Sequence, residues 1–235
     1  MSTFESRKRS RELNEKLIKL ALISAATISI LTTFGILFSI LFEAIEFFKL
    51  RSFWYFITGA TWSPGVIGSQ FGALPIFAGT FVITIIALGV AIPVGLGSAI
   101  YMSEYASANI RDYLKPLLEI LAGIPTVVYG FFAAITVAPL VVQIAEFFGL
   151  EATFNSALAS GVVMGIMIIP VISSLSDDVI RAVPDSQRKA AFALGMTHGE
   201  TIKNIVLPSA MPGIISASLL GLSKALGETM IVVMA

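Results

Sequence analysis

The sequence of 235 residues contains no cysteine, which excludes disulfides, thiolate metal sites and cysteine nucleophiles from it. Histidine is almost absent as well. His198 stands alone, so we expect no metal site and interpret this loop residue as solvated. No G-x-x-x-x-G-K-[ST] sequence occurs, which excludes a P-loop for nucleotide phosphates in this sequence. Because no catalytic constellation is present, we predict a chain that is not an enzyme and needs no cofactor.

Charge is also scarce. Only 13% of the residues are charged, whereas a soluble domain carries about 25%. Hydrophobic residues make up 56%, and the mean hydropathy is +0.90. This composition is typical of an integral membrane protein, for which we expect lipid and no nucleic acid as a partner.

The uncharged runs are long enough to cross a bilayer. Leu20 to Phe42 provides 23 residues without a charge, enough for a hydrocarbon core of about 30 Å at about 1.5 Å per residue. We place four further spans at roughly 73–101, 116–145, 152–176 and from Leu207 onward. A backbone in lipid must satisfy its own hydrogen bonds, so these spans should be helices. The predicted fold class is all-α, a polytopic helical membrane protein.

Lysine and arginine are distributed unevenly between the two sides of these spans. Lys49 and Arg51 fall on one side. By the positive-inside rule, the N-terminus and the loop 177–206 are therefore predicted to be cytoplasmic. Twelve cations fall on that side: Arg7, Lys8, Arg9, Arg11, Lys16, Lys19, Arg111, Lys115, Arg181, Arg188, Lys189 and Lys203.

The chain divides accordingly into four segments. We expect a basic cytoplasmic segment (1–19), an anchor span (20–48), a periplasmic or interfacial loop (49–72) and a transmembrane domain (73–235). A cleaved signal peptide is the alternative for the N-terminus. The apolar run is too long for an h-region of about 7–15 residues, and no convincing A-x-A site follows it, so we predict a retained anchor.

A polar stretch broken by glycine, residues 184–208, lies between two of the apolar runs. Pro184-Asp185-Ser186 predicts a helix start with Asp185 or Ser186 as the cap, and Gly195 predicts a left-handed stop. Thr197-His-Gly-Glu200 has the spacing of a capping box and predicts a second short helix, which Pro208 would end. The apolar face of that helix would hold Ile202, Ile205 and Val206, with Lys203 and Asn204 pointing away.

Two interpretations of this elbow (residues 184–208) compete. It could lie on lipid headgroups as an amphipathic loop. Alternatively, its small residues Ala190, Ala191 and Ala193 suit the close approach of another protein.

The elbow resembles the EAA loop of ABC-importer permeases, E-A-A-x-x-x-G-x9-I-x-L-P. One position departs from the pattern, because Lys189 stands where the motif has glutamate. The resemblance implies that the elbow is a coupling loop that docks in a groove of an ATPase subunit. The matching positions are Ala190, Ala191, Gly195, Ile205, Leu207 and Pro208.

Three further stretches, 71–106, 121–133 and KALGETM (224–230), resemble PstC-type permease subunits of phosphate importers. This resemblance implies the type I ABC permease fold in the plasma (inner) membrane. It implies a second permease subunit, an ATPase homodimer and an extracytoplasmic phosphate-binding protein as partners. The family pattern continues into a sixth span, so we expect this sequence to stop short of it.

Lys224 and Glu228 lie inside the last apolar run, at a spacing that would place both on one helix face. A charge at a helix centre costs about 2.5–3.5 kcal/mol in membrane insertion and usually faces a partner or a polar pathway. We predict that Lys224 meets phosphate in the translocation path and that Glu228 holds it when the path is empty. The alternative is a self-satisfied pair.

Other charges and glycines receive structural interpretations. Asp177-Asp178 is read as a solvated helix end, and Glu119 as the partner of Lys115 in a helix-end salt bridge. Gly95 and Gly97 are predicted to allow close helix packing.

Three function classes remain. An ABC permease, for phosphate or another oxyanion, explains the elbow. A secondary transporter would need paired inverted repeats or broken helices in matching halves, and neither is clear. A structural membrane protein would leave Lys224 and Glu228 unexplained.

Overall fold

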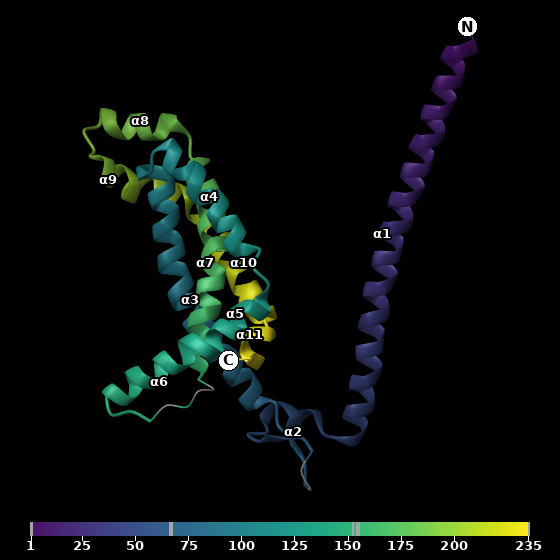
Figure 1. Cartoon of the computed structure of the whole chain (residues 1–235), viewed down its shortest axis with the longest axis vertical. Coiled ribbons are helices and arrows are strands. Elements are labelled where there is room, and N and C mark those ends of the chain that lie inside the picture. The colour runs from purple at the N-terminus through teal and green to yellow at the C-terminus, as the bar shows by residue number, and fades with distance from the viewer. Residues whose placement is uncertain (1, 66–67, 152, 154–155, 235) are drawn as a thin grey trace. The chain divides into compact units, whose positions relative to one another are not determined.

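The structure is a computed structural model that describes residues 2–65, 68–151, 153 and 156–234, with side chains from residue 14 onward. The chain forms two compact units, Met1–Pro75 and Ile76–Ala235. Five helices in the described ranges are long and apolar enough to cross a membrane. The all-α prediction is confirmed (Figure 1).

The first unit is dominated by one helix. Helix α1, Ser2–Leu50, extends the predicted anchor in both directions, and its most apolar window is 0% buried within this chain. Helix α2 (Phe53–Thr58) and a short antiparallel pair, β1 (Trp62–Ser63) and β2 (Gln70–Phe71), follow it. Edge-to-face aromatic contacts join these elements to the end of α1, through Phe47, Phe48, Phe53, Phe56 and Phe71.

The second unit is a bundle whose helices contain three π-helical turns. These turns, η1, η2 and η3, each continue directly from a preceding helix. The elements in chain order are α3 (Leu74–Ile100), η1 (Tyr101–Tyr105), α4 (Ala108–Ala122), α5 (Thr126–Phe132), η2 (Ala133–Val137), α6 (Ala138–Phe147), α7 (Ala157–Arg181), α8 (Asp185–Ala193), α9 (His198–Thr201), η3 (Ile202–Val206), α10 (Leu207–Gly227) and α11 (Met230–Met234).

Helix α7 is the centre of this bundle. Its apolar window is 61% buried, against 28% or less for each of the other candidate spans. Small residues let its neighbours approach closely. A Cβ added to Gly213 of α10 would lie 2.2 Å from Cγ1 of Val179, and one added to Gly95 of α3 would lie 3.0 Å from Cγ2 of Ile172. The packing role predicted for Gly95 is confirmed. A Cβ on Gly97 would meet no heavy atom within 4 Å among the described residues of this chain, so the packing role of Gly97 stays a prediction.

The third span begins later than predicted. Instead of one run over 116–145, α4 ends at Ala122, and the span covers Thr126–Phe147. Gly123 is the C-cap of α4 and Pro125 is the N-cap of α5, so the helix breaks between them, where a residue before proline also favours an extended backbone. Hydropathy alone does not register this break, because the residues around it are apolar.

Pro208 does not end the helix before it. The N–H group of Leu207 donates to the carbonyl oxygen of Ile202, five residues back, and Pro208 follows near the start of α10. The π-helical turn thus carries the chain to a position where proline's missing N–H is tolerated. The result is one helix over His198–Gly227.

Candidate functional site

The elbow lies at one end of the second unit, and α11 lies at the other (Figure 1). Gly195, with φ at +81°, reverses the chain between α8 and α9, as predicted. The predicted capping box is also confirmed, because the hydroxyl of Thr197 accepts from the Glu200 N–H while the Glu200 carboxylate accepts from the Thr197 N–H. The predicted cap of α8 is wrong. Pro184 occupies that position, and it makes no side-chain hydrogen bond.

The predicted faces of the second elbow helix are largely confirmed. Ile202 and Val206 are buried, Ile205 is half-buried, and Lys203 and Asn204 are exposed. The buried residues lie where the sequence placed an apolar face.

An apolar groove of about 390 Å³ opens between α8 and the start of α10. Ser209 donates from its hydroxyl to Oε1 of Gln187 at 3.1 Å beside this groove. Of the six predicted coupling residues, four line the groove: Ala190, Ala191, Ile205 and Pro208.

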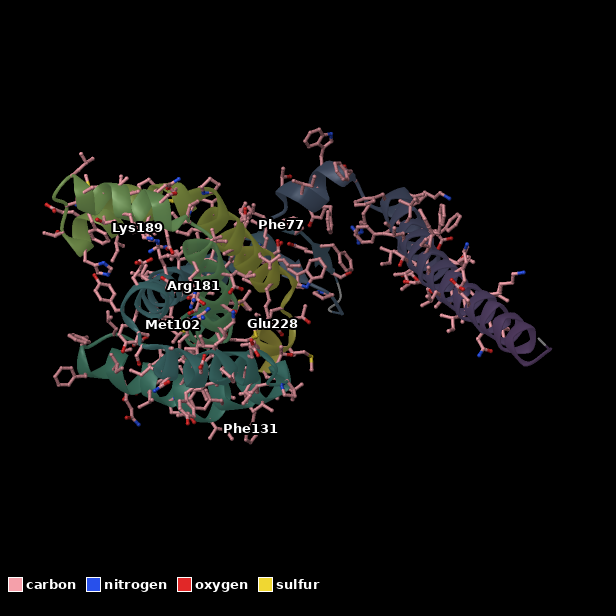
Figure 2. All side chains as sticks on the ribbon, turned by 90° about the horizontal axis from the view of Figure 1, so that it is seen from above. Phe77, Met102, Phe131, Arg181, Lys189 and Glu228 are labelled. Atoms are coloured by element: carbon pink, nitrogen blue, oxygen red, sulfur yellow. The ribbon has the colours of Figure 1, made fainter. Side chains whose placement is uncertain are left out.

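The other two coupling residues have different positions. Gly195 makes the turn, and Leu207 packs on the core cluster around Ile180 and Ala210. The alanines differ too, since Ala190 is exposed whereas Ala191 is 3% exposed. Lys189 is exposed on α8 and is marked in Figure 2.

A buried ion pair that we did not predict holds the elbow. Arg188 of α8 donates from Nη1 to the Glu104 carboxylate in η1, and from Nη2 to the carbonyl oxygen of Ile180 at 2.9 Å. The Glu104 side chain is 4% exposed. One sequence signal pointed to it, because Glu104 is the first charge after the uncharged run 52–103.

The solvated helix end predicted for Asp177 and Asp178 is wrong for Asp177 and confirmed for Asp178, which is exposed near the end of α7. The Asp177 carboxylate is buried and accepts from Arg111 Nη2 at 2.8 Å, and Asp178 accepts from Lys115 Nζ at 2.7 Å. The two cations are four residues apart, so both lie on the face of α4 that packs against α7. The predicted pairing of Lys115 with Glu119 is also wrong, because Lys115 faces Asp178 instead.

His198 is exposed, but it is not simply solvated. Its ring stacks on Phe192 with the centroids 6.2 Å apart, and it meets Tyr105 edge to face at 5.3 Å. Its Nε2 lies 3.3 Å from the carbonyl oxygen of Glu104. The residue therefore joins α9 to η1.

Lys224 and Glu228 do not share a helix face, and that prediction was wrong. Helix α10 ends at Gly227, and Glu228 has an extended backbone with φ at −85° and ψ at 116°. The Glu228 carboxylate accepts from the N–H of Met230 at 3.0 Å. Both side chains are half-buried, and neither makes an ion pair within 4.0 Å among the described residues.

The site contains no feature of a metal centre. In the described part of the chain, no group of three or more His, Asp or Glu side chains gathers as metal ligands would. The elbow instead presents an apolar groove, and ion pairs hold the elbow in place. Such a surface suits recognition of another protein.

Residues 91–235 match the profile of a family described as "Binding-protein-dependent transport system inner membrane component". The chain belongs to this family. The match includes the whole elbow and both charges at the end of α10. The resemblance to ABC permeases read from the sequence is thereby confirmed, and the chain is a multi-pass permease component.

Named relatives agree with this assignment. The chain is 33% identical over 231 residues to "Probable ABC transporter permease protein YqgH" of Bacillus subtilis (strain 168), a match that covers 97% of this chain and 74% of the relative. It is 33% identical over 221 residues to "Phosphate transport system permease protein PstC 1" of Mycobacterium tuberculosis (strain ATCC 25618 / H37Rv), with coverage of 82% and 65%. The chain thus spans about two thirds of that relative's length.

One solved structure is similar in outline. "Inward facing conformations of the MetNI methionine ABC transporter" matches with a TM-score of 0.46 and 20% identity, over 66% of this chain and 68% of that chain.

Proposed function

We propose that this chain is a permease subunit of an ATP-driven importer for inorganic phosphate in the plasma membrane. The observation that carries the proposal is the family match over 91–235 together with relatives named as phosphate transport permeases. In this proposal the basic segment 1–19 and the elbow are cytoplasmic, because twelve loop cations gather on their side and two on the other. The loop 49–72 then faces the periplasm or the interface.

The elbow is the docking surface for an ATPase subunit in this proposal. Its groove is apolar and open, and Leu194 at its rim is 82% exposed. A large exposed apolar side chain beside a groove suits a protein partner better than water. The ATPase, present as a homodimer, hydrolyses ATP and moves the elbow. A second permease and an extracytoplasmic phosphate-binding protein complete the transporter.

Lys224 and Glu228 form part of the translocation path. An intramembrane cation is costly unless an anion or a polar pathway meets it. Since Lys224 has no ion-pair partner among the described residues, its ammonium group is available to an anionic substrate. Lysine acts here as a point charge, so it attracts phosphate without the bidentate geometry that arginine would give.

Transport in proteoliposomes tests this proposal. The full-length protein, assembled with its second permease and ATPase, should accumulate labelled phosphate when the binding protein and ATP are supplied. Sulfate or molybdate offered at equal concentration would compete if the substrate is another oxyanion. Uptake that continues without ATP would instead establish a secondary transporter.

A further inference from the structure

The π-helical turn η1 receives contacts from both helices of the elbow. From α8, Arg188 donates to the Glu104 carboxylate. From α9, the His198 ring lies 3.3 Å from the Glu104 carbonyl oxygen and packs against Tyr105. One turn at the end of the long helix α3 is thus connected to both arms of the elbow.

The ion pair is placed where it is hard to break. The side chains of Glu104 and Arg188 are only 4% and 17% exposed, so separating them would leave a buried carboxylate without its cation. Arg188 also donates to the Ile180 carbonyl at the end of α7. Because separating these charges is costly, a displacement of α8 should shift η1 and the end of α7 with it.

A second carboxylate shows that the contact to Glu104 is the one that joins helices. Asp185 Oδ1 lies 3.8 Å from Nε of Arg188, but both residues belong to α8, and the Asp185 side chain is 84% exposed. This contact can carry no force between elements. A control for Glu104 is better taken outside the elbow, and Asp178 of α7 provides it, because its carboxylate also pairs with a cation of another helix, Lys115 of α4.

The connected element is suited to transmit motion. The N–H of Ala106 donates to the carbonyl of Tyr101 at 2.8 Å, which closes the wide turn, and the chain then becomes extended. Such turns are concentrated at functional positions in helices. Helix α3 precedes η1 and is 27 residues long, or about 40 Å at 1.5 Å per residue. A displacement of η1 would therefore move one end of a helix that is long enough to cross the membrane.

A polar cavity of about 460 Å³ lies beside this joint. Arg188 lines it together with Ser103, Asp112, Arg181 and Asp185.

We propose that Glu104, Arg188 and His198 form a clamp that carries movement of the elbow into α3, so that they are positioning residues for the coupling of ATP hydrolysis to transport. This inference rests on the proposed function. In the clamp, η1 and the elbow move as one body during the cycle. A merely structural pair would stabilise the fold without affecting the number of anions moved per ATP.

The first test substitutes Glu104→Gln in the complete transporter, with Asp178→Asn as the control. Both variants should assemble with the ATPase and hydrolyse ATP. Phosphate uptake per ATP should fall about tenfold in E104Q, as expected for a lost coupling contact, and stay at the wild-type value in D178N. Equal uptake per ATP in E104Q and the wild type would overturn the clamp. A wild-type transporter without ATP-dependent phosphate uptake would overturn the proposed function instead.

A second measurement keeps the clamp residues intact, and it can still contradict the clamp if E104Q does not assemble. The sequence has no cysteine, so Ser107→Cys and Gly199→Cys would take two spin labels at defined positions. Both residues are exposed, and a Cβ on Gly199 meets nothing within 4 Å. The distance between the labels should stay constant with and without ATP. A distance that changes through the cycle would contradict the clamp.

Discussion

The two ends of α10 carry charges in opposite states. Beside its first end, the half-buried Arg188 of the elbow and the buried Asp177 of α7 are paired with partners on other helices. Beyond its last residue, Gly227, the carboxylate of Glu228 binds only a nearby backbone N–H group, and Lys224 has no ion pair with any described residue. About 30 Å of helix separates the two ends.

This difference indicates different tasks. Paired buried charges fix the geometry of the elements that they join, and removing one partner is costly. An unpaired ionisable residue within an apolar helix is instead typical of a pathway. We therefore interpret the elbow end of α10 as a rigid joint and the Lys224 end as a binding position for an anion.

The largest expected effect concerns the joint. Asp177→Ala would leave Arg111 without its buried partner and should lower the stability of the fold by about 3–5 kcal/mol. Its neighbour provides the control, since Asp178 is 54% exposed and Asp178→Ala should cost about 0–1 kcal/mol. Denaturation of the purified protein in mild detergent measures both. Equal losses in the two variants would contradict the contrast between a buried and an exposed pair.

The next effect concerns the opposite end. Lys224→Met removes the charge but retains the length of the side chain, and uptake should fall about 10- to 100-fold, as for a lost contact to a charged group. Lys224→Arg keeps the charge and should preserve uptake. Phosphate uptake in proteoliposomes, with binding-protein-stimulated ATP hydrolysis as the companion measurement, checks both. If uptake and its substrate affinity are unchanged in K224M, the pathway interpretation is wrong.

A smaller effect concerns the packing of the first half of α10 against α7. Gly213→Ala would bring a methyl group against Val179 on α7 and should destabilise the bundle by about 1–3 kcal/mol. Gly97→Ala on α3 meets open space within this chain and should be neutral or slightly stabilising. Thermal unfolding in detergent compares the two variants. A neutral G213A would show that α7 and α10 can separate, and the joint would then not be rigid.

Local features of the elbow could be predicted from the sequence. The left-handed turn at Gly195 and the capping box at Thr197 involve neighbours within a few residues, so their spacing alone predicts them. The apolar face of the second elbow helix follows from the helical period in the same way.

The contacts that hold the elbow could not be predicted in this manner. Arg188 and Glu104 are 84 residues apart, and Arg111 and Asp177 are 66 apart. Nothing in one sequence states which charges meet across such distances. The prediction that Lys224 and Glu228 share a helix face was wrong for another reason. It assumed a continuous helix, whereas α10 ends at Gly227. The apolar run extends beyond that break, so hydropathy does not reveal where the helix ends.

The central claim is that the elbow is where the ATPase docks, and co-purification tests it most directly. Ala190 lines the groove of α8, whereas the nearby Ala193 is also exposed but lies outside the groove. Ala190→Trp should fill the groove and reduce the ATPase recovered with the permease about tenfold, through a clash of about 1–3 kcal/mol. Ala193→Trp, outside the groove, should reduce recovery less than Ala190→Trp does. Full recovery of the ATPase with A190W would contradict the account.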